Sequence, residues 1–344
     1  MRALTLPRTG GLDLLELREM PEPALQSPDQ VRVRIHTVGL NRLDLFVIGG
    51  LPRTRVSFPH IIGSDAAGIV DGTGSAVTAV RPGDRVVINP GLSCRRCPVC
   101  LAGDQPLCRE FGILGEHLPG TLAEYVVVPE ANLAVIPAEI PWPQAGAFTL
   151  ATLTAWRMLM TRAGLQAGET VLVWGAGGGV AQAAIRIAKR AGARVIATSG
   201  GAAKREAARA LGADLVLDHT REDVVRQVRD LTGVGADVVV DSVGEATWAA
   251  SLRALRPLGR LVTCGATSGP QVALDVRRLF WFQWSLLGST MGNDREFHAI
   301  VDLLRQGELW PMVDGMVPLA DAPAAFARLA SGQHVGKLVI EVAS

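Results

Sequence analysis

The stretch TVLVWGAGGGVAQAAIRIAKRAG, residues 170–192, decides the fold class of this chain. Its first part, TVLVWG, is a short apolar run typical of a buried strand, and its second part is Ala-rich and long enough for about three helical turns. A glycine-rich turn from a strand into a helix lets backbone N–H groups at the helix N-terminus approach a phosphate, although tight turns of other kinds also favour glycine. The stretch therefore predicts a dinucleotide-binding loop made of Gly175, Ala176, Gly177, Gly178, Gly179 and Val180.

The same alternation of short apolar strands and helices of about ten residues continues to residue 290. Strands are predicted near 193–199, 213–218, 236–244, 259–266 and 285–290, and helices near 202–211, 221–232 and 246–255. Strands joined by helices in this order predict a doubly wound parallel sheet of the α/β class.

The carboxyl ends of such parallel strands line the crevice in which these sheets bind ligands. Four small residues end two of the predicted strands: Val243, Gly244, Gly265 and Ala266. His219 follows the strand LVLD, where its ring can face the adenosine phosphate. We expect these five residues to contact the cofactor.

The strand at 193–199 ends in the sequence TSGG, without the Asp or Glu that usually binds the ribose hydroxyls of NAD. Lys204 and Arg205 follow, and either side chain can meet the 2′-phosphate of NADP. The alternative is that both are solvated in the first turn of the next helix. We expect Ser199 and Lys204 to bind the cofactor, and NADP(H) to be preferred over NAD(H).

The first 150 residues have a different composition, rich in Pro, Gly and short runs of β-branched residues. The run VRVRI at 31–35 alternates, and AGIV at 67–70, DRVVINP at 84–90 and AEYVVVP at 123–129 are further strand candidates. This part predicts a partly open β-barrel. A helix near 294–306 and a closing strand, KLVIEV, follow the parallel sheet in the sequence.

Four of the five cysteines lie close together, with the spacing Cys94-x2-Cys97-x2-Cys100-x7-Cys108. Four thiolates without His or carboxylate favour Zn²⁺ in a closed, structural site, which leaves no open position for water or substrate. An iron–sulfur cluster is a competing interpretation, but the common bacterial spacing places the last cysteine after three residues and follows it with Pro. Four unpaired cysteines are the remaining alternative. Cys264, in the strand LVTCG, reads as a small buried residue.

The composition excludes several classes of partner. Formal net charge is +1 and 48% of the 344 residues are hydrophobic, so the chain can form a large core but has no charge excess that would attract nucleic acid or an anionic membrane. No run reaches about 18 apolar residues and no signal peptide is evident. We therefore expect a cytoplasmic protein whose partner is a small-molecule substrate.

Taken together, these motifs resemble the medium-chain dehydrogenase/reductase superfamily, which includes zinc-containing alcohol dehydrogenases and quinone oxidoreductases. The resemblance covers essentially the whole chain, through VGLNRLD at 38–44, FPHIIGSDAAGIV at 58–70, RPGDRV at 81–86, LTAW at 153–156, HVGKLVIEV at 334–342 and the segments quoted above. It implies a GroES-like β-barrel domain (residues 1–151 and 293–344, with a zinc lobe at 94–108) and a Rossmann domain (152–292). It further implies hydride transfer at nicotinamide C4 in a cleft between the domains, and a homodimer or homotetramer.

The chain departs from this family where zinc alcohol dehydrogenases hold a second, catalytic zinc. Their Cys ligand in a pattern like GxCHTD is replaced by Asn41, and the His of their GHE triplet is replaced by Ser64, before Asp65. The segment before LTAW, residues 148–151, reads FTLA and offers no ligand. Asn and Ser bind Zn²⁺ poorly compared with thiolate and imidazole. We therefore expect a structural zinc and no catalytic zinc.

Without a Lewis acid, a conjugated acceptor is easier to reduce than a simple alcohol is to oxidise, because the negative charge spreads onto a distant oxygen. The predicted function is therefore NADP(H)-dependent hydride transfer to a quinone, an enone or an activated carbonyl. The resemblance suggests Asn41, Asp44, Asp65 and Thr154 as catalytic candidates, and Lys337 near the cofactor. The alternatives are an alcohol dehydrogenase with unusual metal ligands and a non-catalytic NADPH-binding protein.

Overall fold

The computed structural model describes residues 1–52 and 56–343. The chain forms two compact units: unit 1 contains Met1–Ala151 and Gly292–Ser344, and unit 2 contains Thr152–Met291. Unit 1 is thus built from both ends of the sequence.

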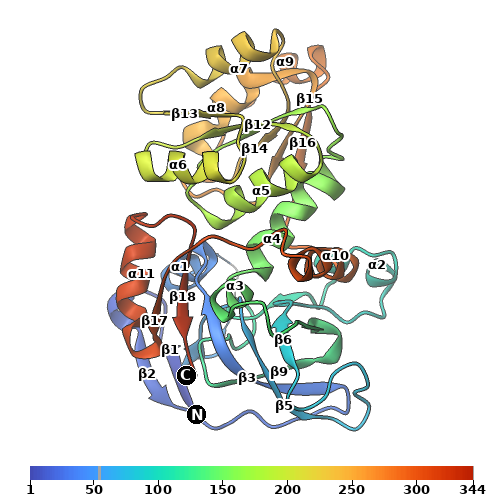
Figure 1. Cartoon of the computed structure of the whole chain (residues 1–344), viewed down its shortest axis with the longest axis vertical. Helices are drawn as coiled ribbons and strands as arrows, with labels where there is room; N and C mark the ends of the chain where they lie inside the picture. Colours follow the sequence, from blue (N-terminus) through green and yellow to red (C-terminus); the bar gives the residue numbers. More distant parts are fainter. Residues whose placement is uncertain (53–55, 344) are drawn as a thin grey trace. The chain divides into compact units, whose positions relative to one another are not determined.

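Unit 2 is a six-stranded sheet with helices on both faces (Figure 1). The strand order is β13-β12-β11-β14-β15-β16, and all neighbours are parallel. The strands are β11 (Thr170–Val173), β12 (Arg194–Thr198), β13 (Leu215–Leu217), β14 (Ala236–Val240), β15 (Leu255–Thr263) and β16 (Ser285–Gly288). This confirms the predicted doubly wound sheet.

Helices α5 and α6 cover one face of this sheet, and α7, α8 and α9 lie on the other (Figure 1). Their bounds are α5 (Gly179–Arg190), α6 (Ala202–Ala210), α7 (Val224–Thr232), α8 (Glu245–Ala254) and α9 (Val276–Trp281). The sequence dictates this packing, because β11 is buried along its whole length while α5 is apolar on one stripe only. Helices α6, α7 and α8 begin within three residues of the starts predicted at 202, 221 and 246, whereas α9 is not among the predicted helices.

Unit 1 is built around a seven-stranded, mostly antiparallel sheet of order β10-β6-β5-β3-β18-β17, with β9 also paired to β3. Its strands are β3 (Gln30–Gly39), β5 (Ala67–Thr73), β6 (Arg85–Ile88), β9 (Tyr125–Pro129), β10 (Leu133–Val135), β17 (Val313–Pro318) and β18 (Lys337–Glu341). Val31, Val33 and Ile35 alternate into the core of this barrel, as their spacing predicts.

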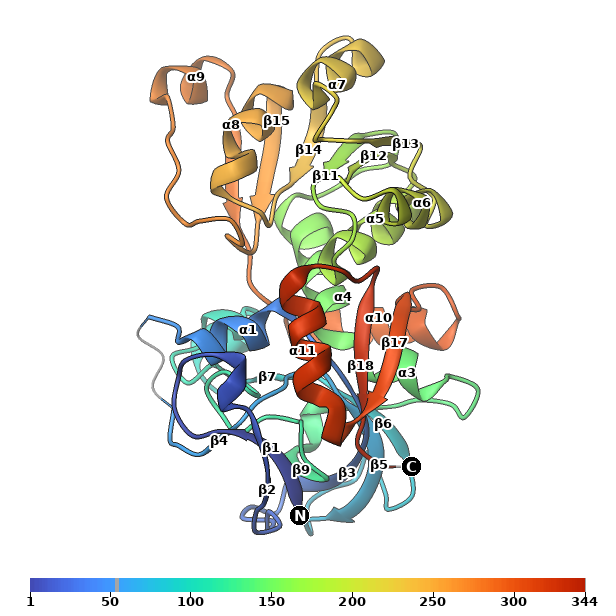
Figure 2. The ribbon, with the colours of Figure 1, turned by 90° about the vertical axis from the view of Figure 1, so that its left-hand side faces the viewer.

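Smaller elements complete unit 1. Strands β1 (Arg2–Leu6), β2 (Glu16–Glu19) and β4 (His60–Ile61) form one sheet, and β7 (Gly91–Leu92) pairs with β8 (Gly112–Ile113). The helices are α1 (Arg42–Gly49), α2 (Pro98–Leu101), α3 (Trp142–Gly146), α10 (Asp294–Arg305) and α11 (Ala322–Ser331). Helix α4 (Thr149–Trp156) begins in unit 1, continues into unit 2 and there runs into a π-helical turn at Arg157–Arg162. Helix α11 lies beside β17 and β18 (Figure 2).

The register of β18 determines which residues meet at the end of β3. The two strands are antiparallel, with Val339 opposite Gly39 and Ile340 opposite Val38. Leu40 N donates to Leu338 O at 2.9 Å, so the ladder continues past the end of β3. Counting back along β18, Lys337 therefore lies level with Asn41, the residue that precedes α1. Among the described residues, no helix is long and apolar enough to cross a membrane.

Candidate functional site

Asn41, Asp65 and Lys337 form a buried hydrogen-bonded cluster in unit 1. The Lys337 ammonium donates to Asn41 Oδ1 at 2.5 Å and to Asp65 Oδ2 at 3.0 Å. Asn41 Nδ2 also donates to Asp65 Oδ2, at 3.0 Å. The Lys337 and Asp65 side chains are 4% and 0% exposed. Lysine can only donate, so its contact fixes which end of the Asn41 amide is the oxygen.

The side-chain amide of Asn41 is fully hydrogen-bonded to other groups of the protein. Its Nδ2 donates to Gly39 O at 3.1 Å as well as to Asp65, so both N–H bonds have partners. The resemblance suggests Asn41 as a catalytic candidate, and the alternative is an Asn that caps a loop; in the structure Asn41 is the N-cap residue of α1. Asn41 holds Lys337 and Asp65 in position and precedes α1.

Asp44 lies in the first turn of α1 and is buried. Asn41 N donates to its Oδ2 at 2.7 Å, which satisfies a helix N-terminus in the usual way. Burial raises the pKa of Asp44 to about 7, and the charge of Asp65 acts in the same direction, against the Asn41 N–H and the Lys337 charge. Asp44 therefore changes its charge close to neutral pH.

Asp65 is held from several sides. Its Oδ1 accepts from Leu150 N at 2.6 Å, and its backbone carbonyl accepts from the Thr121 hydroxyl at 3.0 Å. The neighbouring Ser64 hydroxyl donates to Leu114 O at 2.7 Å. Thr154, the fourth catalytic candidate, is a buried residue of α4 in unit 2.

The positions at which the family resemblance implies catalytic-zinc ligands thus hold a different arrangement. At Asn41 the side-chain oxygen faces an ammonium, and at Ser64 the hydroxyl is bonded to backbone. A second cation beside Lys337 would meet its charge at close range. Among the described residues, the four lobe cysteines are the one group of three or more His, Cys, Asp and Glu side chains whose ligand atoms converge.

The cysteine cluster fits a tetrahedral ion. The ligand atoms of Cys94, Cys97, Cys100 and Cys108 lie within 4.8 Å of one another, and three of the Sγ–Sγ distances are 3.5, 3.9 and 3.9 Å. Four sulfurs bound to zinc at about 2.3 Å lie about 3.8 Å apart, which matches these values and excludes disulfide bonds. Backbone N–H groups of Arg96 and Cys97 lower the pKa of Cys94 to about 6 and so favour the thiolate, the form that binds metal.

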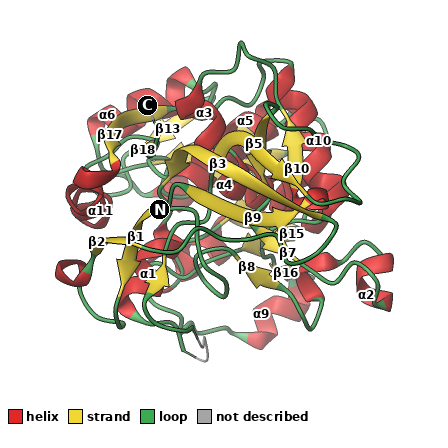
Figure 3. Cartoon of the chain, turned by 90° about the horizontal axis from the view of Figure 1, so that it is seen from below, coloured by secondary structure: helices red, strands yellow, loops and turns green. Residues whose placement is uncertain are grey.

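The lobe that carries these cysteines is braced by the start of α10. Arg95 makes a two-point ion pair with Asp294, at 2.9 and 3.1 Å. Asn293, which caps α10, donates to Gly103 O at 2.6 Å. Helix α2 of the lobe lies at the rim of the unit, away from β3, β5 and β9 (Figure 3). The geometry therefore supports a bracing metal rather than a reacting one.

The glycine loop joins β11 to α5, as the sequence predicts. Gly175 has φ of +71°, which favours glycine, and Gly178 precedes the first residue of α5. A Cβ at Gly177 would lie 2.4 Å from the Lys204 Cδ, so the Lys204 stem rests directly on the loop backbone. The free N–H groups at the start of α5 suit a pyrophosphate.

The residues that follow β12 form the part of unit 2 that is expected to bind the adenosine phosphate of the cofactor. Arg205 donates to the carbonyls of Ser199 and Gly200 at 3.1 and 2.9 Å and pairs with Asp218 at 2.8 Å, so it braces this loop. His219 Nδ1 lies 3.3 Å from Thr198 Oγ1. Partial withdrawal from water lowers the pKa of His219, which keeps its ring neutral near pH 7. Lys204 is then the better candidate of the two basic residues for a 2′-phosphate.

The expected strand ends lie at one edge of the sheet in unit 2. After β14, the Asp241 carboxylate accepts from Val243 N and Gly244 N at 2.9 and 3.0 Å and so turns the chain. Gly265 and Ala266 follow β15, which pairs with β14 in parallel. Lys337, in contrast, belongs to unit 1. The structure thus groups the expected cofactor residues of unit 2 and places Lys337 with Asn41 and Asp65.

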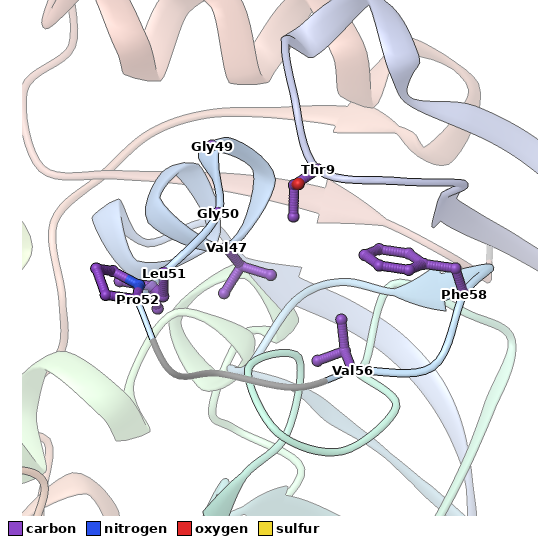
Figure 4. Close-up of a pocket in the computed structure, with 8 residues that line it drawn as sticks. All are labelled: Thr9, Val47, Gly49, Gly50, Leu51, Pro52, Val56 and Phe58. Atoms are coloured by element: carbon purple, nitrogen blue, oxygen red, sulfur yellow. The ribbon is translucent and has the colours of Figure 1, made fainter.

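A pocket of about 720 Å³ lies at the C-terminal end of α1. Figure 4 shows the side chains of Thr9, Val47, Val56 and Phe58 around it. Its lining exposes polar and apolar surface in about equal amounts, so the pocket indicates no particular class of ligand. The sequence gives no local signal for this pocket, because its walls come from Thr9 and from the separate segment that follows Val47.

Comparisons with known proteins agree with this description. Residues 27–138 match the alcohol dehydrogenase GroES-like domain, and residues 179–306 match the zinc-binding dehydrogenase family. The chain is 33% identical to a quinone oxidoreductase of Pseudomonas aeruginosa, over 96% of both proteins. It is 30% identical to an NAD-dependent alcohol dehydrogenase of Sulfolobus acidocaldarius, over 99% of this chain and 100% of that protein. The crystal structure of an NAD-dependent alcohol dehydrogenase superimposes with a TM-score of 0.96, at 43% identity and full coverage of both chains.

A Rossmann-type sheet with a glycine loop and a GroES-like barrel with a four-cysteine lobe, in one chain, define a zinc-binding dehydrogenase. The chain belongs to the medium-chain dehydrogenase/reductase superfamily and is an oxidoreductase. Its relatives carry the names of both quinone oxidoreductases and alcohol dehydrogenases.

Proposed function

We propose that this oxidoreductase uses NADP(H) to transfer hydride to a quinone, an enone or an activated carbonyl, with a structural zinc in the cysteine lobe and no catalytic zinc. The observation that carries the proposal is that the Asn41 amide and the Ser64 hydroxyl are hydrogen-bonded within the protein. By resemblance, these two residues stand where zinc alcohol dehydrogenases have a thiolate and an imidazole ligand. A nicotinamide cofactor supplies the hydride when it is bound.

The substrate class follows from how charge is stabilised. Removing hydride from a simple alcohol requires a stabilised alkoxide, which a metal provides well. Adding hydride to a conjugated acceptor places the charge on a delocalised oxygen, for which hydrogen-bond donors are sufficient.

The cofactor preference rests on the loop after β12. It lacks an acid at residues 198–201, and Lys204 lies against the phosphate-loop glycine Gly177. Asp218, which follows β13, is paired with Arg205. A lysine near the end of β12, in a loop without an acid, favours a 2′-phosphate over a free ribose hydroxyl.

Metal analysis combined with steady-state kinetics tests the proposal. Purified protein is expected to contain about one zinc per chain and to oxidise NADPH with benzoquinone or cyclohexenone, as one Cys₄ site predicts. Added zinc is expected to leave this rate unchanged. Activity that appears only with a second bound metal would contradict the proposal, as would a preference for NADH.

A second candidate is an NAD-dependent alcohol dehydrogenase, favoured by the names of two of the relatives compared above. It requires a second metal near Asn41, with ligands other than the usual thiolate and imidazole. Oxidation of primary or secondary alcohols with NAD⁺, proportional to a second equivalent of metal, distinguishes it. NADPH binding without turnover of any acceptor supports a non-catalytic role instead.

We also propose that the chain assembles as a homodimer or homotetramer through the β16 edge of unit 2. Strand β16 has the sequence SLLG, without a charge or a proline, and ends the six-stranded sheet. Val276, Phe280 and Trp281 of α9, just before it, are exposed. A second copy related by a two-fold axis can extend the sheet and cover these side chains. Light scattering is expected to give a mass above 36.3 kDa for the wild type and a smaller species for Trp281→Glu.

A further inference from the structure

Strands β12 and β13 end side by side in unit 2. They are parallel, with Thr198 opposite Leu217, and Ser199 N donates to Leu217 O at 3.0 Å. The residues that follow each strand, Ser199 and Asp218, therefore leave the sheet together. The loop after β12, where the adenosine ribose is expected, has no acid at residues 198–201 but has the Asp218 carboxylate as a neighbour from the next strand.

The Asp218 carboxylate holds Arg205 against this loop. Arg205 Nη1 lies 2.8 Å from Asp218 Oδ2 and donates to the carbonyls of Ser199 and Gly200 at 3.1 and 2.9 Å. The side chains of Arg205 and Asp218 are only 20% and 11% exposed. A charge-assisted hydrogen bond with two further acceptors gives the guanidinium a defined position. Arg205 is thus directed to the protein by a residue that lies outside its own loop.

The two oxygens of Asp218 have separate partners. Its Oδ1 accepts from Thr220 N and Thr220 Oγ1, at 3.0 and 2.6 Å, whereas its Oδ2 faces Arg205. Hydrogen bonds from Thr220 lower the pKa of Asp218, against partial desolvation. The charges of Arg205 and Arg221 lower this pKa further, so the carboxylate is ionised near neutral pH. The contact with Arg205 is therefore an ion pair under ordinary conditions.

The two adjacent basic residues of α6 are used differently. The Lys204 stem rests on the glycine loop, since a Cβ at Gly177 would lie 2.4 Å from its Cδ. Arg205 instead turns to the end of β13, where Asp218 balances its charge. The fields of two opposite charges 2.8 Å apart largely cancel at a greater distance. A phosphate that approaches the loop after β12 therefore meets a neutral pair at Arg205 instead of a cation.

We propose that Asp218 is a positioning residue that sets the cofactor selectivity, because it withholds Arg205 from a 2′-phosphate and leaves Lys204 as the one of the two basic residues that binds it. This inference rests on the proposed use of NADP(H). It predicts that the preference for a 2′-phosphate is weaker than two cations allow, and that releasing Arg205 strengthens it. The rival arrangement, in which Asp218 presents Arg205 to the phosphate, predicts the opposite sign.

Asp218→Asn tests this sign. The asparagine retains an oxygen for Thr220, but its Nδ2 only donates and cannot accept from Arg205. Calorimetry gives the dissociation constants of 2′,5′-ADP and 5′-AMP, which differ by the 2′-phosphate and need no turnover. The ratio of the two constants is expected to shift about three- to tenfold in favour of 2′,5′-ADP. This gain is expected to shrink as salt rises from about 0.05 to about 0.5 M, with 5′-AMP binding unchanged throughout.

The matched control is Asp214→Asn. It removes a carboxylate of unit 2 that pairs with Lys189 at 2.8 Å and accepts from Val195 N, near the opposite end of β12. The net charge of the protein changes by the same amount as in Asp218→Asn. The ratio of the two dissociation constants is expected to stay at the wild-type value, so a general effect of charge is separated from the release of Arg205.

The double variant Arg205→Ala, Asp218→Asn removes the ion pair as a whole. Its ratio is expected to lie within about twofold of the wild type, because a neutral pair contributes little. An unchanged or smaller preference for 2′,5′-ADP in Asp218→Asn would overturn the inference. A loss of about tenfold in the double variant would do the same, since it would show that Arg205 binds the phosphate. If Asp218→Asn does not fold, the double variant alone decides.

The same measurements separate this inference from the proposed function. A wild type that binds 5′-AMP more tightly than 2′,5′-ADP, and that reduces acceptors with NADH, contradicts the proposed cofactor. The role of Asp218 is judged instead by the direction in which the ratio moves between the wild type and Asp218→Asn.

Discussion

Asp44→Asn is expected to remove a pH dependence of stability that originates in one buried carboxyl group. The substitution keeps the shape of the side chain and an oxygen that can accept from Asn41 N, so the start of α1 is preserved. It removes a charge that faces Asp65 and Lys337 inside unit 1. Any difference in the pH dependence of stability between the two proteins therefore reports the ionisation of the Asp44 carboxyl group.

The magnitude follows from the pKa of Asp44. Burial raises it from 3.8 to about 7, about three units, and each unit corresponds to 1.36 kcal/mol. The folded state binds this proton more tightly than the unfolded state, so the contribution to stability is fully present below pH 3.8 and is lost as pH rises to about 7. The full loss is about 4 kcal/mol, of which about 2 kcal/mol falls between pH ~5.5 and ~8.5.

Urea unfolding of wild type and Asp44→Asn at these two pH values measures the effect. The wild type is expected to lose about 2 kcal/mol more free energy of unfolding than the variant as pH rises. Comparing the two proteins cancels the pH dependence of zinc binding, which both share. Equal changes in the two proteins would show that Asp44 is ionised throughout this range and would refute the reasoning.

Three further predictions concern the metal lobe and the cofactor loop. Cys97→Ser is expected to lower bound zinc, measured by mass spectrometry, and to make the lobe sensitive to proteolysis, because three thiolates hold zinc less well than four. Arg95→Ala is expected to retain zinc but to release it faster to a chelator, since Arg95 ties the lobe to Asp294. Gly177→Ala is expected to raise the NADPH dissociation constant about tenfold by displacing the Lys204 stem. The same change in a Lys204→Ala background is expected to have little effect, and additive effects would show that the two residues act independently.

Unit 2 could be predicted in some detail because its signals are local. The strand β11, the glycine turn and the helix α5 follow one another in the sequence, and each is specified by its own composition. The zinc lobe is similar, since its four ligands lie within fifteen residues. Helices α1 and α11 were not predicted, because α1 is short and the start of α11 contains a proline that reads as a turn.

The contacts that define the candidate site are not local, and this is why the sequence did not reveal them. Lys337 meets Asn41 only because β18 pairs with β3 in one particular register. From the sequence, Arg205 is a basic residue available to bind a 2′-phosphate, but in the structure it is paired with Asp218 at the end of the neighbouring strand. In both cases the residue types are visible in the sequence, but which side chains meet depends on how the strands pair in the tertiary structure.

The late position of Lys337 in the sequence has a consequence for synthesis. Asn41 and Lys337 are separated by 296 residues, so at about 5–20 residues per second the ribosome adds the lysine roughly 15–60 seconds after the asparagine. Until Lys337 is added, Asp65 lacks the cation that accompanies it in the barrel, although all of unit 2, which ends at Met291, has already been synthesised. A nascent chain that stalls before β18 would present an open sheet edge and an uncompensated carboxylate, two features by which chaperones and proteases can distinguish it from the finished enzyme.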